Sequence, residues 1–327
     1  MIDPHRLKEW PEFVRHSLAR QFVGTAEWSG ELAGQTVKVV ANNAQLLQCL
    51  TRPLAHLQQA SEALEGAELE IEIHSQPTSA SPGEVHFQRS PDHNYAFQWL
   101  PHSQSAWARR EKRLIVRASD PARLSLYELG RPFHAMLSLW AQEVGSQIVH
   151  AGLVARDNRG VLIGGDSGQG KSTLALACLR AGFKFLGDDL CFLGADSHGY
   201  SLYSTTFLKP EARAQWPELG PEALAPRFSW EEKCLTYLHP DQATSLASKV
   251  AIAAVLLPGP EGQRVSSLTP MQALRRIAPS TLLTGPLTAG KAGLEQLTGL
   301  VQSRPCFHLP WSCDPAETVS GLLDSLK

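Results

Sequence analysis

The sequence predicts an α/β protein in two parts, an α+β domain over residues 1–120 followed by an α/β domain over residues 121–327. The first part holds short segments that alternate apolar and polar residues between polar turns, which is typical of antiparallel strands. In the second part, strand and helix patterns alternate along the chain. A glycine-rich run lies between one such strand and the helix that follows it. At about 150 residues per domain, a chain of 327 residues also favours two domains.

Composition excludes several classes of protein. Hydrophobic residues make up 43% of the chain and charged residues 19%, which supplies a large core and argues against a disordered or fibrous chain. Lys+Arg total 30 and Asp+Glu total 32, so the formal net charge is −2 and we expect no nucleic-acid partner. The longest apolar run, residues 250–257, is shorter than the roughly 20 residues of a spanning helix, so we expect no membrane partner.

The N-terminus shows no apolar signal region, and the six cysteines are scattered without a C-x-x-C pair. Both features favour a cytoplasmic protein with reduced, mostly buried thiols. Cys306, His308 and Cys313 lie close together in sequence, but a fourth ligand at zinc-like spacing is missing. We therefore expect ordinary packing for these three residues.

In the first part, the residue patterns predict a helix, a hairpin, two helical pieces and four strands. The helix covers residues 5–20, and the hairpin covers 25–41 with its turn at Gly34. Helical pieces follow over 43–64 with a break at Pro53. The strands, expected to pair mainly antiparallel, cover 69–73, 85–88, 95–99 and 114–117.

In the second part, a helical stretch over 123–144 with a break at Pro132 leads into a strand at 148–151. Towards the C-terminus we expect helices over 269–276, 289–302 and 314–326 and a strand over 306–309, as scaffold around the sheet. Met271, Leu274 and Ile277 recur at helical spacing, which predicts that all three are core residues.

The strongest motif is Gly165-x-x-x-x-Gly170-Lys171-Ser172, which follows a short apolar strand at 161–163 and opens a helix over 173–180. This context favours a P-loop, in which glycines let backbone N–H groups wrap a phosphate and the helix start favours anions. In such a loop the lysine reaches the β- and γ-phosphates, and the serine hydroxyl ligates Mg²⁺. The predicted nucleotide-binding residues are Gly165, Asp166, Ser167, Gly168, Gln169, Gly170, Lys171, Ser172 and Thr173.

Two carboxylates, Asp188 and Asp189, end the next predicted strand over residues 183–187. Ligands bind at the carboxyl edge of α/β sheets, where such side chains collect. Neighbouring residues on a strand point to opposite sides, so one aspartate could hold a metal while the other acts as a base. The alternative is a solvated Asp-Asp turn.

Three elements together resemble the catalytic domain of HPr kinase/phosphorylase and the related P-loop kinases. They are His150-Ala151 at a strand end, the Gly165–Ser172 loop and the Gly187-Asp188-Asp189 turn. The resemblance covers about residues 145–327 and is strongest over 148–190. It implies that the domain of residues 121–327 has a nucleotide-binding fold like that of phosphoenolpyruvate carboxykinase, with ATP and Mg²⁺ as cofactors. It also implies an oligomer.

The same resemblance implies a role for each matching residue. Lys171 is similar to the phosphate-binding lysine, and Ser172 and Asp188 are similar to the Mg²⁺ ligands. Asp189 matches the base that takes the proton of the acceptor hydroxyl. His150 matches a catalytic histidine close to that base. Lys209 and Lys233 lie where relatives carry lysines that meet the phosphate or the substrate.

One stretch departs from the family. The E-x-R-G-x-G sequence that follows the Asp pair in the bifunctional enzyme is absent, and residues 201–211 stand in its place. We therefore expect a substrate other than HPr, and reverse phosphorolysis is in doubt. Within this stretch Glu211 is expected to be a helix-start residue rather than a metal ligand.

The favoured function is an ATP- and Mg²⁺-dependent kinase that phosphorylates a hydroxyl of a peptide, protein or small molecule. Residues 1–120 would then recognise the substrate or form a subunit contact. One alternative is a non-catalytic nucleotide sensor, and another is a carboxykinase-like phosphotransferase. An ABC-type motor is disfavoured because the sequence lacks an LSGGQ-type signature.

Overall fold

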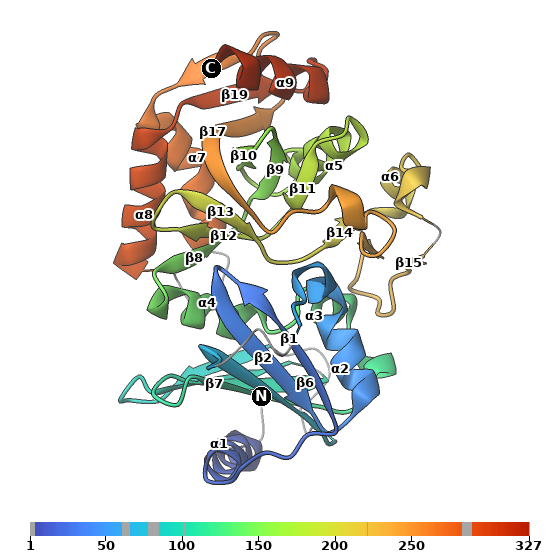
Figure 1. Cartoon of the computed structure of the whole chain (residues 1–327), viewed down its shortest axis with the longest axis vertical. Coiled ribbons are helices and arrows are strands. Elements are labelled where there is room, and N and C mark those ends of the chain that lie inside the picture. Colours follow the sequence, from blue (N-terminus) through green and yellow to red (C-terminus); the bar gives the residue numbers. More distant parts are fainter. Residues whose placement is uncertain are drawn as a thin grey trace. The chain divides into compact units, whose positions relative to one another are not determined.

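The computed structural model describes residues 4–60, 66–77, 85–100, 102–220, 222–282 and 290–326. It is a mixed α/β structure with several sheets, divided into two compact units, Met1–Trp140 and Ala141–Lys327 (Figure 1). The division falls within α4 (His134–Glu143), later in the chain than the expected boundary after residue 120. The reason is that α3 (Leu126–Gly130) packs against the N-terminal unit's α2 (Ala44–Thr51) and buries Leu126 there.

The N-terminal unit is built on a seven-stranded sheet with the strand order β1-β2-β3-β7-β6-β5-β4. The pairs β2/β3 and β3/β7 are parallel and the other four are antiparallel, so the prediction of mainly antiparallel strands is confirmed. The strands are β1 (Ala26–Leu32), β2 (Gln35–Ala41), β3 (Leu69–Ser75), β4 (His86–Arg89), β5 (Tyr95–Trp99), β6 (Ser103–Ala108) and β7 (Arg113–Ala118).

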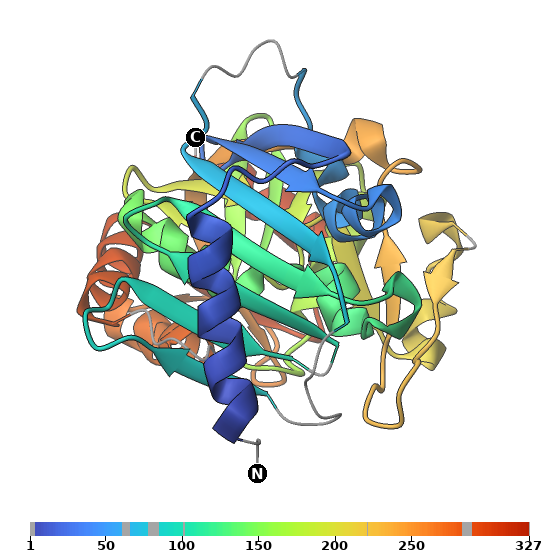
Figure 2. The same cartoon turned by 90° about the horizontal axis from the view of Figure 1, so that it is seen from below.

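Helix α1 (Pro4–Leu18) covers one face of this sheet, as Figure 2 shows for the dark blue helix. Its Trp10 and Val14 are fully buried against Phe97, Trp99 and Ile115 of the sheet. Apolar residues four apart share one helix face, which is why this segment packs as an amphipathic helix. The predicted helix at 5–20 and the hairpin at 25–41 are both confirmed.

Strand β6 was not expected from the sequence. Its residues Ser103–Ala108 are all buried although half of them are polar, so no alternation of burial marks the strand. Gln104 is buried because its side-chain oxygen accepts a hydrogen bond from Arg117 Nε at 2.7 Å. The predicted break at Pro53 is confirmed, since α2 gives way there to a 3₁₀ helix over Arg52–Leu57. Part of the expected helical stretch, residues 61–64, lies outside the described residues.

The C-terminal unit is built on a nine-stranded sheet with the order β11-β9-β10-β17-β13-β12-β8, extended by β19 beside β17 and by β18 beside β19. The pairs β10/β17 and β17/β19 are parallel, and the other pairs are antiparallel. The strands are β8 (Ser146–Val149), β9 (Gly152–Arg156), β10 (Arg159–Ile163), β11 (Lys184–Gly187), β12 (Cys191–Gly194), β13 (His198–Ser201), β17 (Lys249–Gly259), β18 (Ser266–Leu268) and β19 (Cys306–Pro310).

Helices cover both faces of this sheet, with α7 (Pro270–Leu282) and α8 (Gly290–Ser303) on one face and α5 (Lys171–Arg180) and α9 (Pro315–Ser325) on the other (Figure 1). The period-two alternation of a strand explains the division, because Leu162 of β10 packs with α7 and α8 while Val161 and Ile163 pack with α5 and α9.

A separate three-stranded sheet has the order β14-β16-β15. Its strands are β14 (Thr205–Leu208), β15 (Ala223–Leu224) and β16 (Cys234–Tyr237), and the short helix α6 (Pro210–Arg213) follows β14.

The core prediction for α7 holds only in part. Ile277 is fully buried and Leu274 half-buried, but Met271 is 58% exposed, so its assignment to the core was wrong. The sheet-facing side of α7 uses Ala273 and Ile277, four residues apart, and Met271 lies in the first turn outside that face.

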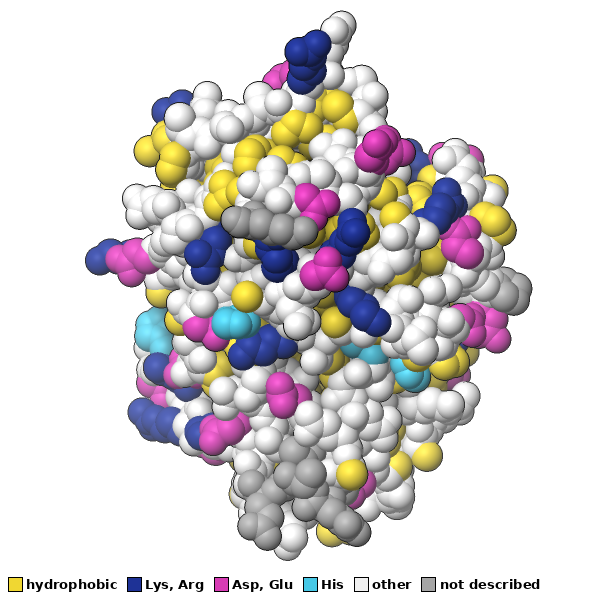
Figure 3. All heavy atoms as spheres, turned by 45° about the horizontal axis from the view of Figure 1, so that its top comes forward, with side chains coloured by type: hydrophobic (Ala, Val, Ile, Leu, Met, Phe, Trp, Pro, Cys, Tyr) yellow, Lys and Arg dark blue, Asp and Glu magenta, His cyan; other side chains and the backbone are white. Residues whose placement is uncertain are grey.

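The thiols are mostly buried, as predicted, since Cys178, Cys191, Cys234 and Cys306 are buried. Cys306 and His308 are buried, Cys313 is half-buried, and the described residues contain no group of three or more His, Cys, Asp or Glu that could hold a metal. Cys49 is also only half-buried. Within the described ranges, no helix combines the length and apolar character needed to cross a membrane. Acidic and basic side chains are intermixed on the face drawn in Figure 3, in keeping with their near-equal numbers.

Candidate active site

The glycine-rich loop joins β10 to α5, the strand–loop–helix context that the sequence predicts. Gly165, Gly168 and Gly170 have φ values of 121°, 83° and 89°. L-residues with a Cβ rarely adopt this left-handed region, so the path of the loop requires glycine at these positions. The loop thereby turns sharply enough to start α5 at Lys171.

The start of α5 offers an anion-binding environment. Ser172 and Thr173 lie in its first turn, where the backbone N–H groups have no partner within the helix. The helix dipole adds partial positive charge at this end. Asp166 and Ser167 are exposed on the loop, and Gln169 is half-buried.

The ammonium group of Lys171 lies against this loop. Lys171 is 5% exposed, and its Nζ donates hydrogen bonds to the carbonyl oxygens of Gly165 at 2.8 Å and Asp166 at 2.9 Å. Burial lowers the pKa of Lys171, while the charges of Asp189, Asp166 and Asp188 raise it and that of Lys233 lowers it further. Both members of the acid pair therefore act electrostatically on the loop lysine.

Asp188 follows the end of β11 and is 3% exposed, so a solvated turn does not describe it. Its Oδ2 accepts a hydrogen bond of 2.5 Å from the hydroxyl of Thr206 on β14. Thr206 is fully buried. A buried carboxylate is costly unless it is compensated, and a hydroxyl donor supplies part of that compensation.

Asp189 meets His150, which directly follows β8. The distance from His150 Nε2 to Asp189 Oδ1 is 2.9 Å, and the two side chains are 16% and 21% exposed. An ionised carboxylate only accepts hydrogen bonds, so the contact requires the proton on Nε2. The other ring nitrogen, Nδ1, is buried and makes no hydrogen bond within the described residues.

The two predicted lysines lie together at one end of the β14/β16 pair. The last paired residues are Leu208 and Cys234, so Lys209 and Lys233 stand one register step beyond them. Both lysines are exposed, and Lys233 is near enough for its charge to lower the pKa of Lys171. Glu211 is exposed in the first turn of α6, which agrees with its interpretation as a helix-start residue.

Sequence reasoning missed two residues beside this site, Thr206 and Trp311. Thr206 gives little signal because its partner Asp188 is 18 positions away in sequence. Trp311 directly follows β19, is 57% exposed, and its indole Nε1 donates to the carbonyl of Gln169 at 3.1 Å. The signal that could have found it is a tryptophan just beyond the predicted strand over 306–309, because ligands bind at the carboxyl ends of such strands.

Ser172 and Asp188 provide hydroxyl and carboxylate oxygens, which are the donors that Mg²⁺ prefers. Mg²⁺ is usually held by one or two carboxylates together with substrate phosphates, rather than by a cage of protein groups. One hydroxyl and one carboxylate are chemically compatible with that mode of binding.

Comparisons with known proteins find a distant structural likeness and no sequence match to a family or a curated protein. The sequence matches no protein-family model, and no curated protein matches it significantly. Among solved structures, the HPr(Ser) kinase/phosphatase from Coxiella burnetii is similar to 55% of this chain and 95% of its own, with 14% sequence identity and a TM-score of 0.29. The likeness is distant.

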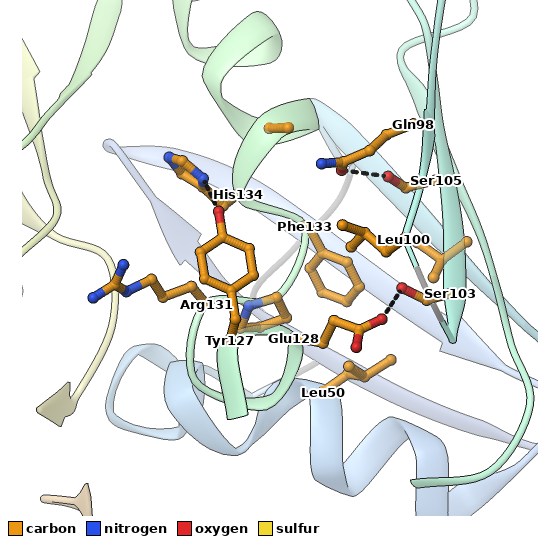
Figure 4. Close-up of a pocket in the computed structure, with 13 residues that line it drawn as sticks. Leu50, Gln98, Leu100, Ser103, Ser105, Tyr127, Glu128, Arg131, Phe133 and His134 are labelled. Atoms are coloured by element: carbon orange, nitrogen blue, oxygen red, sulfur yellow. Dashed lines mark hydrogen bonds between the residues drawn. The ribbon is translucent and has the colours of Figure 1, made fainter. Parts of the chain in front are cut away.

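A second polar cluster lies in the N-terminal unit, around a cavity of about 30 Å³ (Figure 4). The buried Glu128 accepts hydrogen bonds from the hydroxyls of Ser103 at 2.6 Å and Ser125 at 2.7 Å, and the latter pair forms a capping box at α3. Tyr127 Oη lies 2.8 Å from His134 Nδ1. These internal partners and a water-sized volume indicate a structural cluster.

Proposed function

We propose that this chain is an ATP- and Mg²⁺-dependent kinase that transfers the γ-phosphate to a hydroxyl group of a peptide, protein or small molecule. One observation carries the proposal. A glycine-rich loop that opens a helix holds a buried lysine, Lys171, and the turn after β11 carries a buried carboxylate, Asp188, beside a His-paired one, Asp189. Phosphoryl transfer needs these parts: a phosphate cradle, a cation and a group that receives a proton.

The loop and Lys171 would bind the nucleotide. Phosphate oxygens are better partners for an ammonium group than the two carbonyls that Lys171 now contacts, because they carry full charge. Residues 165–173 would supply backbone N–H groups to the same phosphates. Ser172 and Asp188 would hold Mg²⁺, which, when bound, neutralises charge on the phosphates.

Asp189 would act as the general base. The acceptor's O–H proton passes to the Asp189 carboxylate as the oxygen forms its bond to the γ-phosphorus, and the bond from that phosphorus to the departing ADP oxygen breaks. His150 would position Asp189 through the Nε2 contact. Base catalysis of this kind typically contributes about 10²–10⁴-fold to the rate.

The remaining assignments follow from position and charge. Lys209 and Lys233 are exposed cations at one end of the β14/β16 pair, where they could meet the γ-phosphate or an anionic part of the substrate. The N-terminal unit would recognise the acceptor or form a subunit contact in an oligomer. A cytoplasmic location supplies both ATP and reduced thiols.

The test combines nucleotide binding with transfer of ³²P from [γ-³²P]ATP to peptides and cell extract. Lys171→Ala should lose nucleotide binding or transfer, and Asp189→Asn should keep binding and lose at least about 100-fold in transfer. Lys291→Ala and Asp157→Asn are matched controls, because their side chains are 90% and 81% exposed.

Each alternative predicts a different result. A nucleotide sensor would bind ATP and keep its output in Asp189→Asn, and a carboxykinase-like phosphotransferase would require a carboxylic-acid substrate. Wild-type protein that binds no nucleotide in the presence of Mg²⁺ would contradict the proposal outright.

A further inference from the structure

A groove of about 240 Å³ opens beside the glycine-rich loop, in the C-terminal unit. It is formed where the parallel strands β17 and β19 end and where α5 begins. Ligands of α/β sheets bind at this edge, outside the carboxyl ends of the strands. The groove is lined by Gly170, Thr173, Leu174, Pro258, Leu309, Pro310, Trp311, Cys313 and Pro315.

Trp311 is the largest of these side chains, and its position is fixed at two points. Its backbone N–H donates to the carbonyl of Gly259 at 3.0 Å, and its indole Nε1 donates to the carbonyl of Gln169 at 3.1 Å. The ring nevertheless remains 57% exposed. A held but exposed indole beside an apolar groove is suited to stack on a flat ligand, because stacking covers the ring face without moving it.

The position of the groove beside the loop indicates how a bound nucleotide would be oriented. Gly170 and Thr173 line it, whereas Lys171, Asp188 and Asp189 are not among the lining residues. In a P-loop the lysine binds the terminal phosphates. A nucleotide with its γ-phosphate towards Asp189 would therefore place its other end on the groove side of the loop.

We infer that this groove holds the nucleobase of the bound nucleotide, stacked on Trp311. The inference rests on the proposed function, since it requires phosphates on residues 165–173. Most of the lining side chains are apolar, and the polar ones are the Thr173 hydroxyl and the Cys313 thiol. Stacking tolerates any base because every base has a π-face, so the site would accept ATP and GTP with similar affinity.

The experiment compares two probes, Mg-ATP and inorganic triphosphate, by calorimetry on the full chain. Wild-type protein should bind ATP more tightly than triphosphate. Trp311→Ala should weaken ATP binding about 10- to 100-fold and leave triphosphate binding within about twofold. Trp311→Phe should recover part of the loss. Trp230→Ala is the matched control, because Trp230 is 55% exposed in the same unit and stacks on Phe228 instead.

The outcomes separate the two proposals. If wild-type protein binds neither probe, the proposed function fails and this inference fails with it. If it binds triphosphate as tightly as ATP, or if Trp311→Ala weakens both probes equally, only the nucleobase site is overturned.

Labelling gives an independent readout in the same protein. ATP should slow the alkylation of Cys313, which lines the groove, and triphosphate should not. Cys49, half-buried in the N-terminal unit, is the internal reference. Equal protection of Cys313 by both probes would place the base elsewhere.

Discussion

His150 Nε2 lies 2.9 Å from Asp189 Oδ1, and the backbone N–H of His150 donates to the hydroxyl of Thr281 at 3.2 Å. His150, at the end of β8, thus contacts both the Asp188-Asp189 turn after β11 and helix α7. The backbone of His150 is held at this point, and its ring, through Nε2, can keep the neighbouring carboxylate in one orientation. That arrangement suits a base which must meet a hydroxyl within hydrogen-bond reach.

Replacing His150 should therefore slow transfer rather than weaken nucleotide binding. We expect His150→Ala to lower kcat about 10-fold or more while the KM for ATP stays within twofold, and His150→Gln to recover part of the rate. An equal loss of ATP binding, or no recovery of rate in His150→Gln, would indicate a merely structural role.

Thr206 should affect stability and nucleotide binding through its hydrogen bond to Asp188. Thr206→Val keeps the shape of a fully buried side chain and removes the hydroxyl that donates to Asp188 Oδ2. The loss should destabilise the protein by about 1–3 kcal/mol, because a buried carboxylate loses one of its hydrogen-bond donors. It should also weaken Mg-ATP binding.

Urea unfolding and calorimetry measure both effects of this change. Thr298→Val on the half-exposed side of α8 is the control and should change neither quantity appreciably. If Thr206→Val and Thr298→Val change stability and Mg-ATP affinity equally, Thr206 has no specific role at the site.

Two glycines with open space around them should respond in opposite ways to alanine. A Cβ on Gly168 or on Gly299 would meet no atom within 4 Å. Gly168 has φ 83°, so Gly168→Ala should strain the loop by about 1–2 kcal/mol and weaken triphosphate binding. Gly299 lies inside α8, so Gly299→Ala should stabilise the protein by about 0.5–1 kcal/mol. Calorimetry and thermal unfolding distinguish the pair, and a tighter triphosphate complex in Gly168→Ala would contradict this account.

The N-terminal unit should lose stability in mild acid because of His74. Burial, with a smaller contribution from Arg117, lowers the pKa of His74 from 6.5 to about 4. Its ring packs between Phe13 and Phe22. The Glu72 carboxylate, 3.4 Å from Nε2, would favour the charged ring, but Glu72 is already paired with Arg113.

The unfolded chain protonates His74 near pH 6.5 and the folded chain only near pH 4. The stabilisation that depends on a neutral His74 is therefore complete above pH 6.5 and is lost as the pH falls towards 4. The free energy of unfolding should drop by an amount on the order of 3 kcal/mol over this range. Hydrogen exchange of the β3 amides should follow this decline. His74→Gln should make the pH dependence shallower, and His16→Gln, at an exposed position, should not.

Local sequence patterns were enough to predict many of the elements. The glycine loop, the helix that follows it and the hairpin turning near Gly34 depend on backbone conformation and apolar spacing within a few residues. Strands whose burial depends on partners far away in the chain were harder to predict from the sequence. Strand β6 was missed because its polar residues are buried by partners elsewhere in the chain, such as Arg117 for Gln104.

The candidate site divides in the same way. The sequence alone determined which residue types could bind phosphate and that two acids follow the next strand, because those signals lie within one strand–loop–helix segment. The resemblance already implied that His150 lies close to Asp189, and the structure shows their contact. Only the tertiary structure decided that Thr206 meets Asp188 and that Trp311 borders the loop. These contacts join segments far apart in sequence, and the Thr206–Asp188 contact joins two different sheets, so they are set by packing of the whole unit rather than by neighbours along the chain.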